Sequence, residues 1–312
     1  MRGFNLIPAD INLGLISRKT VFFAFSLLLV VLSVAVFSIK GLSYGIDFKG
    51  GIMIDVRTSG PADLGAMRSE LGALGLGEVA LQEFGQPDDV LIRIQRQPGG
   101  EEGQQAALTK VKQALGPGVE YRRTEFVGPK VSSELLLDGV MAVGFAILAI
   151  LIYIWFRFEW QFGLGAIVAL LHDVVTTIGI FALMGLEFNL STVAAVLTIA
   201  GYSINDTVVV YDRVRENLRK FKKMALPELL NNSINQTLSR TVITSLTTLL
   251  ALLALYFLGG EVIRDFSFAM IWGVLIGTYS SVCLAVPLLL YMNIRRSSRQ
   301  DSDKETVAPA SP

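Results

Sequence analysis

Six long apolar runs constrain this chain more than any other feature of its sequence. Each is close to the roughly 20 residues that a helix needs to cross the hydrocarbon core of a membrane. Hydrophobic residues make up 52% of the chain and charged residues only 17%, which is unusual for a soluble domain of this length. We therefore predict an α-helical polytopic membrane protein, with spans at about Val21–Ile39, Leu135–Phe156, Leu164–Met184, Leu190–Tyr211, Val242–Leu258 and Phe266–Met292.

The basic residues between these runs predict the orientation of the chain. Lys and Arg gather on the cytoplasmic side of membrane proteins, and here they precede the first run and follow the second, fourth and sixth. We therefore expect both termini in the cytoplasm, with residues 1–20 as an N-terminal segment and residues 293–312 as a polar, disordered tail. The net charge is zero, so charge gives no reason to expect a nucleic-acid partner.

The first run is longer than the apolar core of a signal peptide and is not followed by a convincing cleavage site. We therefore expect residues 21–39 to remain in the protein as a transmembrane helix, and residues 134–292 to hold the other five. The single cysteine, Cys283, excludes an intramolecular disulfide and is expected to act as a small hydrophobe.

Residues 40–133 contain no spanning segment and are long enough for one small domain. The period of the apolar residues switches between that of a strand and that of a helix along this stretch. The predicted order is β-α-β-β-α-β, which is typical of a ferredoxin-like α+β domain. Its expected elements are strands at Ile52–Arg57, Val79–Phe84, Val90–Ile94 and Val119–Val127, and helices around Leu64–Leu74 and Leu108–Leu115.

Three ionisable residues fall inside the predicted spans: Asp173, Asp206 and Arg240. Such residues are costly in a membrane and usually face a protein interior or a water path. Asp206 and Arg240 lie at comparable depth and can pair if their helices pack together. A carboxyl that alternates between an arginine and water would change its proton affinity with conformation, which is what proton coupling requires. The alternative is that these groups only hold the helices together.

Polar neighbours extend these positions into stripes at helical spacing. Asn205 adjoins Asp206, and Thr244 lies one turn from Arg240. His172 adjoins Asp173, and is either a member of a relay or a buried neutral histidine. We expect Asn205, His172 and Thr244 to support a proton relay if one exists. The spacing of two glycines in the last run also predicts a close helix contact, at Gly273 and Gly277.

Several motifs, in order along the chain, resemble the SecF members of the SecD/SecF family, within the resistance-nodulation-division (RND) superfamily. The resemblance covers the chain outside its tail. The motifs are GIDFKGG at Gly45–Gly51, VGP at Val127–Pro129, FRFEW at Phe156–Trp160, LHD at Leu171–Asp173, GYSINDTVVVYDRVREN at Gly201–Asn217 and SRT at Ser239–Thr241.

This resemblance implies half of an RND-type transporter, with six transmembrane helices and one ferredoxin-like periplasmic domain, in the bacterial inner membrane. It implies a motor subunit that uses the proton-motive force to assist preprotein translocation through the SecYEG channel. SecD, the SecYEG translocon, YajC, the unfolded preprotein and membrane lipid are the implied partners. No enzyme activity, metal site or cofactor is implied, apart from coupling to an H⁺ or Na⁺ gradient.

By motif, the resemblance assigns Asp206 and Arg240 to the proton relay, with Asp173 as a further motif position. The segment that holds Asp47, Gly50 and Gly51 would couple the periplasmic domain to the membrane, although its glycines also suit a simple turn.

Three other readings compete with this one. A small-molecule or lipid exporter shares the architecture but usually carries both halves and larger periplasmic domains on one chain. An intramembrane aspartyl protease also needs two aspartates on neighbouring spans, but Asp206 lacks the glycine-flanked motif of such enzymes. A purely structural scaffold would keep full activity after Asp206→Asn. The sequence leaves open the coupling ion, its stoichiometry, the precursors served and whether SecD is obligatory.

Overall fold

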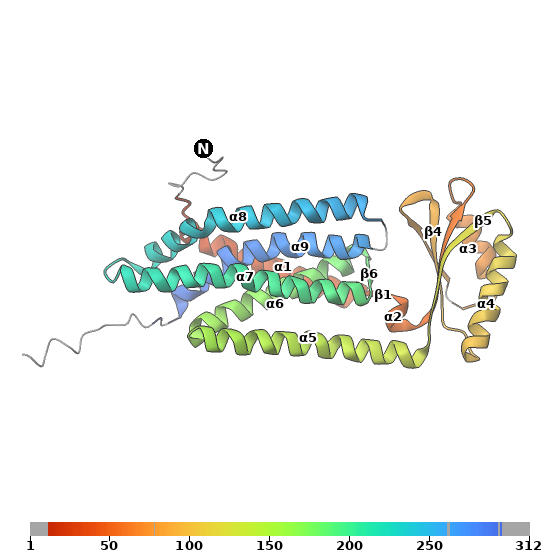
Figure 1. Ribbon diagram of the computed structural model, residues 1–312, viewed down its shortest axis with the longest axis horizontal. Helices are drawn as coiled ribbons and strands as arrows, with labels where there is room; N and C mark the ends of the chain where they lie inside the picture. The colour runs from red at the N-terminus through yellow and green to blue at the C-terminus, as the bar shows by residue number, and fades with distance from the viewer. Residues whose placement is uncertain (1–11, 78, 261–262, 293, 295–312) are drawn as a thin grey trace, which may run out of the picture.

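The computed structural model describes residues 12–77, 79–260, 263–292 and 294. The predicted N-terminal segment is therefore described only from residue 12, and the predicted tail lies outside the described residues except for Ile294. The molecule is elongated, with a bundle of long helices at one end and a small sheet domain at the other (Figure 1).

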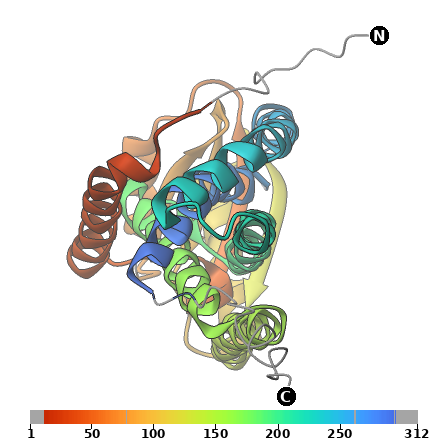
Figure 2. The ribbon, with the colours of Figure 1, turned by 90° about the vertical axis from the view of Figure 1, so that its left-hand side faces the viewer.

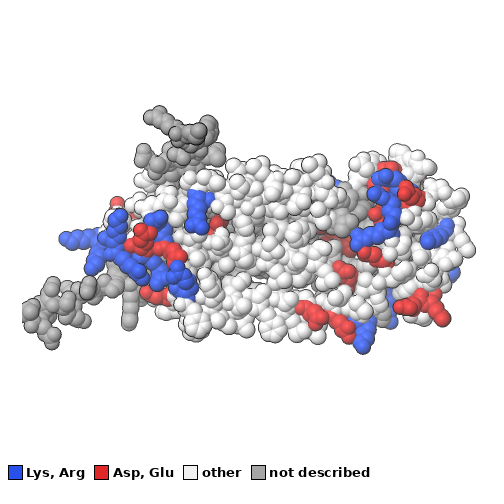
Figure 3. All heavy atoms as spheres, viewed as in Figure 1, with Lys and Arg blue, Asp and Glu red and all other residues white. Residues whose placement is uncertain are grey.

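Within the described residues, six helices are long and apolar enough to cross a membrane, as predicted. We call them, with the short segments that join them, the membrane half. Charged side chains are sparse along the middle of this half and gather at its two ends (Figure 3), which is the distribution expected around a hydrocarbon layer. The spans lie in α1 (Lys19–Lys40), α5 (Pro129–Arg157), α6 (Trp160–Met184), α7 (Leu190–Lys220), α8 (Leu226–Leu258) and α9 (Arg264–Ser280) with its continuation to Tyr291.

The last span changes its winding after α9. A π-helical turn, Ser281–Ala285, follows directly and leads into the short helix α10 (Val286–Leu288). Single π-turns inside long helices often mark functional positions, because the extra residue shifts the facing of the side chains around it.

α8 begins sixteen residues before the expected start of its span. Its first half carries many polar side chains, so hydropathy alone did not mark it as part of the span. It is amphipathic, and Leu229, Leu230 and Ile234 are fully buried along one face. Arg240 consequently lies near the middle of α8, whereas the sequence placed it at the start of a helix.

The sheet domain has the predicted β-α-β-β-α-β order and an antiparallel sheet in the order β3-β4-β2-β5, which is ferredoxin-like. Alternate apolar residues of its strands pack under two helices and form a separate core. The elements are β2 (Gly51–Thr58), α3 (Leu64–Gly72), β3 (Val79–Phe84), β4 (Gln86–Ile94), α4 (Gly100–Leu115) and β5 (Val119–Val127).

The two helices of this domain cover the sheet face that points away from the membrane half, so the other face looks toward the membrane helices (Figure 1). Between them lie a short helix, α2 (Ile46–Lys49), and a two-stranded parallel ladder of β1 (Ser43–Tyr44) with β6 (Glu187–Phe188). We call the end of the membrane half next to the sheet domain its outer end, and the opposite end its inner end.

Seen along the helices, α1 and α5 lie at the rim of the bundle (Figure 2). α5 has no buried residue in its most apolar window, and α1 has few. The interior of the bundle is built from α6, α7 and α9, and α8 packs on one side of α7 and α9.

Candidate functional site

Asp206 lies on the buried side of α7, with only 3% of the residue exposed. Its Oδ2 atom is buried and has no hydrogen-bond partner among the described residues. Burying a polar atom without a partner is unfavourable, and such atoms in native proteins call for an explanation. Asp206 is therefore a buried carboxyl with one oxygen for which the described part of the chain supplies no hydrogen-bond partner.

The neighbouring surface of α7 is polar and uncovered. Thr198, Gly201 and Asn205 are exposed at intervals of one helical turn. Small and polar residues at this spacing are typical of helix contacts inside membranes. Asn205 thus lies at the surface, directly beside the buried Asp206.

Arg240 lies on α8, which packs against α7. Its side chain is exposed, and no ion pair joins it to Asp206 in the described part of the chain. Its charge nevertheless acts on Asp206 electrostatically. Thr244, the predicted support, donates its hydroxyl hydrogen bond to the Arg240 carbonyl of its own helix at 2.9 Å. The structure thus places Asp206 and Arg240 on adjacent helices, but no ion pair joins them in the described part of the chain.

Asp173 has the opposite surroundings. It is fully buried on α6, and Ser203 of α7 and Ser280 of α9 donate hydrogen bonds to its Oδ2 at 2.6 and 2.7 Å. His172 Nδ1 lies 2.9 Å from its Oδ1. Both carboxyl oxygens therefore have partners, and Asp173 ties three helices together at one point.

The serines around Asp173 were not singled out from the sequence. Ser280 is the last residue of α9 before the π-turn, and Ser281 opens that turn. The Ser281 hydroxyl lies 2.8 Å from Thr207 Oγ1 of α7 and donates to the Ser203 carbonyl at 3.3 Å. The Ser280–Ser281 pair inside an apolar run was the available signal, but serine is too common in membrane helices for that signal to be specific.

The predicted coupling residues lie at the outer end. Asp47 Oδ2 accepts a hydrogen bond from the Leu190 N–H at 2.9 Å, and so caps the first turn of α7. Asn189 caps the same end through a capping box with Thr192. The segment that enters the sheet domain therefore holds the start of the helix that carries Asp206.

Gly50 and Gly51 make the turn from this segment into β2. Their φ angles are +70° and +129°, which residues with a Cβ rarely adopt. A Cβ on Gly51 would also lie 2.5 Å from the Ile94 carbonyl oxygen of the neighbouring strand. The two glycines are therefore required by backbone conformation and, at Gly51, by close packing.

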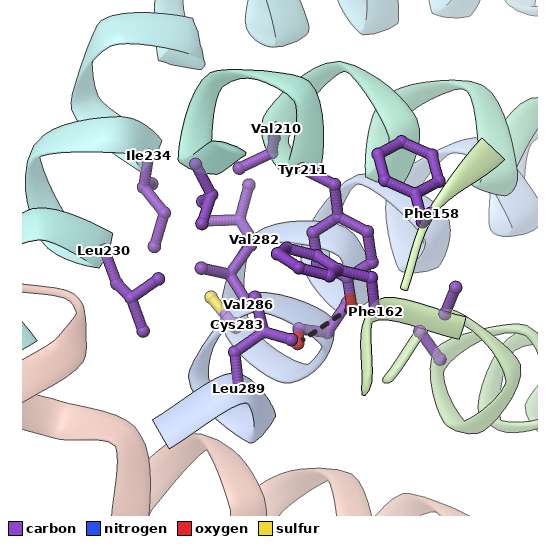
Figure 4. Close-up of a cluster of buried hydrophobic side chains, with 14 of the residues drawn as sticks. Phe158, Phe162, Val210, Tyr211, Leu230, Ile234, Val282, Cys283, Val286 and Leu289 are labelled. Carbon is purple, nitrogen blue, oxygen red and sulfur yellow. Dashed lines mark hydrogen bonds between the residues drawn. The ribbon is translucent and has the colours of Figure 1, made fainter. Parts of the chain in front are cut away.

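The inner end is held by a buried cluster around Tyr211 of α7. Its ring packs edge-on against Phe158 and Phe162, and its hydroxyl donates to the Ala285 carbonyl of the π-turn at 3.1 Å (Figure 4). Two guanidinium groups, of Arg157 and Arg215, lie over the Phe158 ring at 5.4 Å. This explains Arg157 and Phe158 of the FRFEW motif as parts of a structural joint between α5, α6 and α7, whereas Phe156 and Trp160 are exposed.

Comparison with known proteins gives two family matches that together cover most of the chain. The model described as protein export membrane protein SecD/SecF, C-terminal, matches residues 107–295, and the SecD/SecF GG motif matches residues 35–62. The protein translocase subunit SecF of Rickettsia felis is 46% identical over 299 residues, which are 95% of this chain and 96% of that relative. The chain belongs to the SecD/SecF family.

Solved structures agree with this assignment. SecDF from Thermus thermophilus, a translocon-associated membrane protein, matches with a TM-score of 0.84 and 39% identity over 92% of this chain. SecDF in a super-membrane-facing form matches with a TM-score of 0.67, also at 39% identity, over 90% of this chain. The chain spans only 39% of the length of each of these SecDF chains. The SecF of Rickettsia akari is a further relative, 48% identical over 288 residues.

Membership in the family makes this chain a multi-pass membrane protein of protein export. Within the described residues no group of three or more His, Cys, Asp or Glu side chains is placed to hold a metal ion. The buried polar residues of the described bundle include the carboxyls of Asp173 and Asp206, the imidazole of His172 and several hydroxyls.

Proposed function

We propose that this chain is the SecF subunit of a SecDF-type complex in a bacterial inner membrane, and that it uses the proton-motive force to assist preprotein export through the SecYEG channel. The observation that carries the proposal is a contrast at one depth of the bundle. Asp206 is a buried carboxyl with an oxygen that has no hydrogen-bond partner among the described residues, and Arg240 beside it is an exposed arginine.

The exposed polar surface of α7 and α8 supports a second protein as partner. An arginine and an asparagine facing lipid near the middle of a span are costly, whereas facing another protein they are not. We therefore assign this surface, which includes Asn205 and Arg240, to contact with the SecD half. The family's SecDF chains are more than twice as long as the part that this chain matches, which leaves room for such a half.

The charge distribution supports the orientation expected from the sequence. The inner end carries a group of Lys and Arg side chains at the end of α7 and beyond it, seen at the left of Figure 3. Positive residues favour the cytoplasmic side. The proposal therefore places the inner end in the cytoplasm and the sheet domain in the periplasm.

The coupling step follows from the two states of Asp206. An ionised Asp206 is attracted to Arg240, whereas a protonated one is not. Proton binding from one side of the membrane and release to the other would thus alternate the attraction between α7 and α8. Asp47 joins the outer end of α7 to the segment entering the sheet domain, so movement of α7 reaches that domain. Asp173, with both oxygens bonded, serves as the fixed point of the bundle.

The test compares Asp206→Asn with Asp212→Asn in inverted membrane vesicles that contain the native SecD partner, at matched expression. Asp212 lies on the same helix, pairs with Arg157 at 2.8 Å and has a side chain that is 41% exposed, so it is a matched control. We expect Asp206→Asn to lose the part of preprotein export that depends on the ion gradient, and Asp212→Asn to keep it. Export by Asp206→Asn at the wild-type rate with and without a gradient would overturn the proposal.

Replacing the proton gradient by a sodium gradient in the same vesicles identifies the ion. We expect export to follow the proton gradient, because no group of three or more His, Cys, Asp or Glu side chains in the described part of the chain is placed to hold a metal ion.

A further inference from the structure

The uncovered face of the sheet and the outer end of the membrane half enclose a cavity of about 180 Å³. Carboxylates dominate its wall: Asp47 of α2, Asp55 of β2, Glu125 of β5, Glu187 of β6 and Asp265 of α9. Leu91 also lines the cavity and is only 4% exposed, although it lies outside the core under the two helices of the sheet domain. Contact with the membrane half therefore covers this part of the sheet.

An ion pair crosses the boundary beside this cavity. Arg93 of β4 and Glu187 of β6 approach to 2.5 Å between Nη2 and Oε2. Their side chains are 21% and 10% exposed, so the pair is shielded from water. Shielding strengthens the attraction and makes the loss of either partner costly.

Glu187 is also fixed to the start of α7. It lies in the five residues between α6 and α7, and β6 pairs with β1 through Ser43 and Tyr44. Two residues later Asn189 caps α7, and Asp47 caps the same turn. Asp206 follows sixteen residues after the first residue of α7, or about 24 Å along the helix. A displacement of Glu187 would therefore be transmitted to α7, the helix that carries Asp206.

We propose that the Arg93–Glu187 ion pair is a releasable latch, which holds the sheet domain on the outer end of α7 and opens when that domain swings away. No motif suggested either residue. The latch itself is independent of the ion coupling proposed above, although its use in export rests on that function.

Release is favoured by the charges that surround Glu187. Asp47, Glu125 and Asp265 repel its carboxylate, and Arg93 is the cation that faces it. Burial raises the pKa of Glu187 and Arg93 opposes that rise. Removing Arg93 therefore leaves three like charges near the Glu187 carboxylate, which favours separation of the two domains.

The experiment measures opening directly, in membrane vesicles that expose the sheet domain, contain the native partner and have no ion gradient. Leu91→Cys, in a Cys283→Ala background, reports opening through its rate of modification by a membrane-impermeant maleimide. We expect slow modification in this parent, and a rate about tenfold higher after Glu187→Gln or Arg93→Glu. The double variant Arg93→Glu/Glu187→Arg is expected to return the rate toward that of the parent.

Arg123→Gln is the matched control, because it breaks an ion pair with Glu125 at the same cavity but within the sheet domain. It is expected to leave the rate unchanged. Equal rates in the parent and the Glu187→Gln variant, or failure of the exchanged pair to restore protection, would overturn the latch.

The exchanged pair guards against variants that simply misfold, because it replaces both native side chains and still restores an ion pair at this boundary. Asp206→Asn should leave all these rates unchanged, so the latch and the proposed coupling can fail separately.

Discussion

Two buried carboxyls, Asp173 and Asp206, lie on neighbouring helices of the same bundle and differ in their contacts. Asp173 is bonded through both oxygens to groups from its own helix and from α7 and α9. Asp206 has a buried oxygen without a partner in the described part of the chain, and the nearby arginine does not reach it. α7 therefore has a closed side, toward α6 and α9, and an open side, toward α8 and the uncovered surface.

This difference distinguishes two roles of a buried carboxyl. A carboxyl whose hydrogen bonds are complete stabilises one arrangement of helices and resists change. A carboxyl without a hydrogen-bond partner breaks few interactions when its protonation state or its neighbours change. Each residue lies in a motif of its own, Asp173 in LHD and Asp206 in GYSINDTVVVYDRVREN. Only their surroundings distinguish the carboxyl that is suited to change its contacts.

The largest expected effect is that of removing Asp173. Asp173→Ala leaves the Ser203 and Ser280 hydroxyls and His172 without their buried acceptor, and should lower the free energy of unfolding by about 3–5 kcal/mol. Asp206→Ala removes no hydrogen bond and should change it by less than about 1 kcal/mol. Unfolding of the purified chain in mixed micelles, titrated with sodium dodecyl sulfate, measures both. Equal losses would show that the two sites do not differ as their contacts indicate.

Asp89, a carboxyl of the sheet domain, provides a reference for the stability that a hydrogen-bonded carboxyl contributes. Asp89 of the sheet domain accepts two hydrogen bonds at 2.7 Å from the Arg57 guanidinium. That bonding holds the pKa of Asp89 below its usual value of 3.8. Its contribution to stability is therefore complete above the unfolded-state pKa and is lost as the pH falls through the lower pKa of the folded state.

Asp89→Asn should accordingly cost about 1.5–3 kcal/mol at neutral pH, and the cost should shrink in acid. Hydrogen exchange of the β2 and β4 amides, followed from pH 7 down to about pH 3, measures this loss. Asp88→Asn is the control, because Asp88 lies at the longer distance of 3.4 Å from Arg57 and is more exposed. A constant cost across the series would contradict the assignment.

Glycines on the two sides of α7 sharpen the comparison further. A Cβ on Gly273 of α9 would lie 2.2 Å from the buried Ile199 side chain of α7. Gly273→Ala should therefore cost about 1–3 kcal/mol and loosen the hydroxyls around Asp173. On the open side, a Cβ on Gly201 meets nothing within 4 Å among the described residues. Gly201→Ala should stabilise the isolated chain by about 0.5–1 kcal/mol. Thermal unfolding in detergent distinguishes them, and a loss at both positions would mean that α7 has no open side.

Much of this architecture could be predicted from the sequence, because it follows from local patterns. Run length predicted the six spans, and the strand and helix periods predicted the order of the sheet domain. The rarity of ionisable residues in spans singled out Asp173, Asp206 and Arg240. All of these depend on neighbours along the chain and need no knowledge of how distant segments meet.

The missed features depend on contacts between distant segments. Ser203 and Ser280 matter because they meet Asp173 from two other helices. Arg93 and Glu187 belong to different domains and form a pair only when those domains meet. The first half of α8 was missed for another reason, because its apolar residues cover one face only and its mean hydropathy stays low.

Arg240 offers the smallest expected effect on the chain alone and therefore the most selective test of the open side. Its side chain is exposed and forms no ion pair within the described residues. Arg240→Gln should change the free energy of unfolding by no more than about 0.5 kcal/mol. If a partner covers this surface, the same variant should weaken copurification with the native SecD half about tenfold. Arg219→Gln, an exposed charge near the end of the same hairpin, is expected to change neither quantity. Loss of stability without loss of association would place Arg240 on the closed side of α7. The open and closed sides would then no longer explain why Asp206 and Asp173 differ in their contacts.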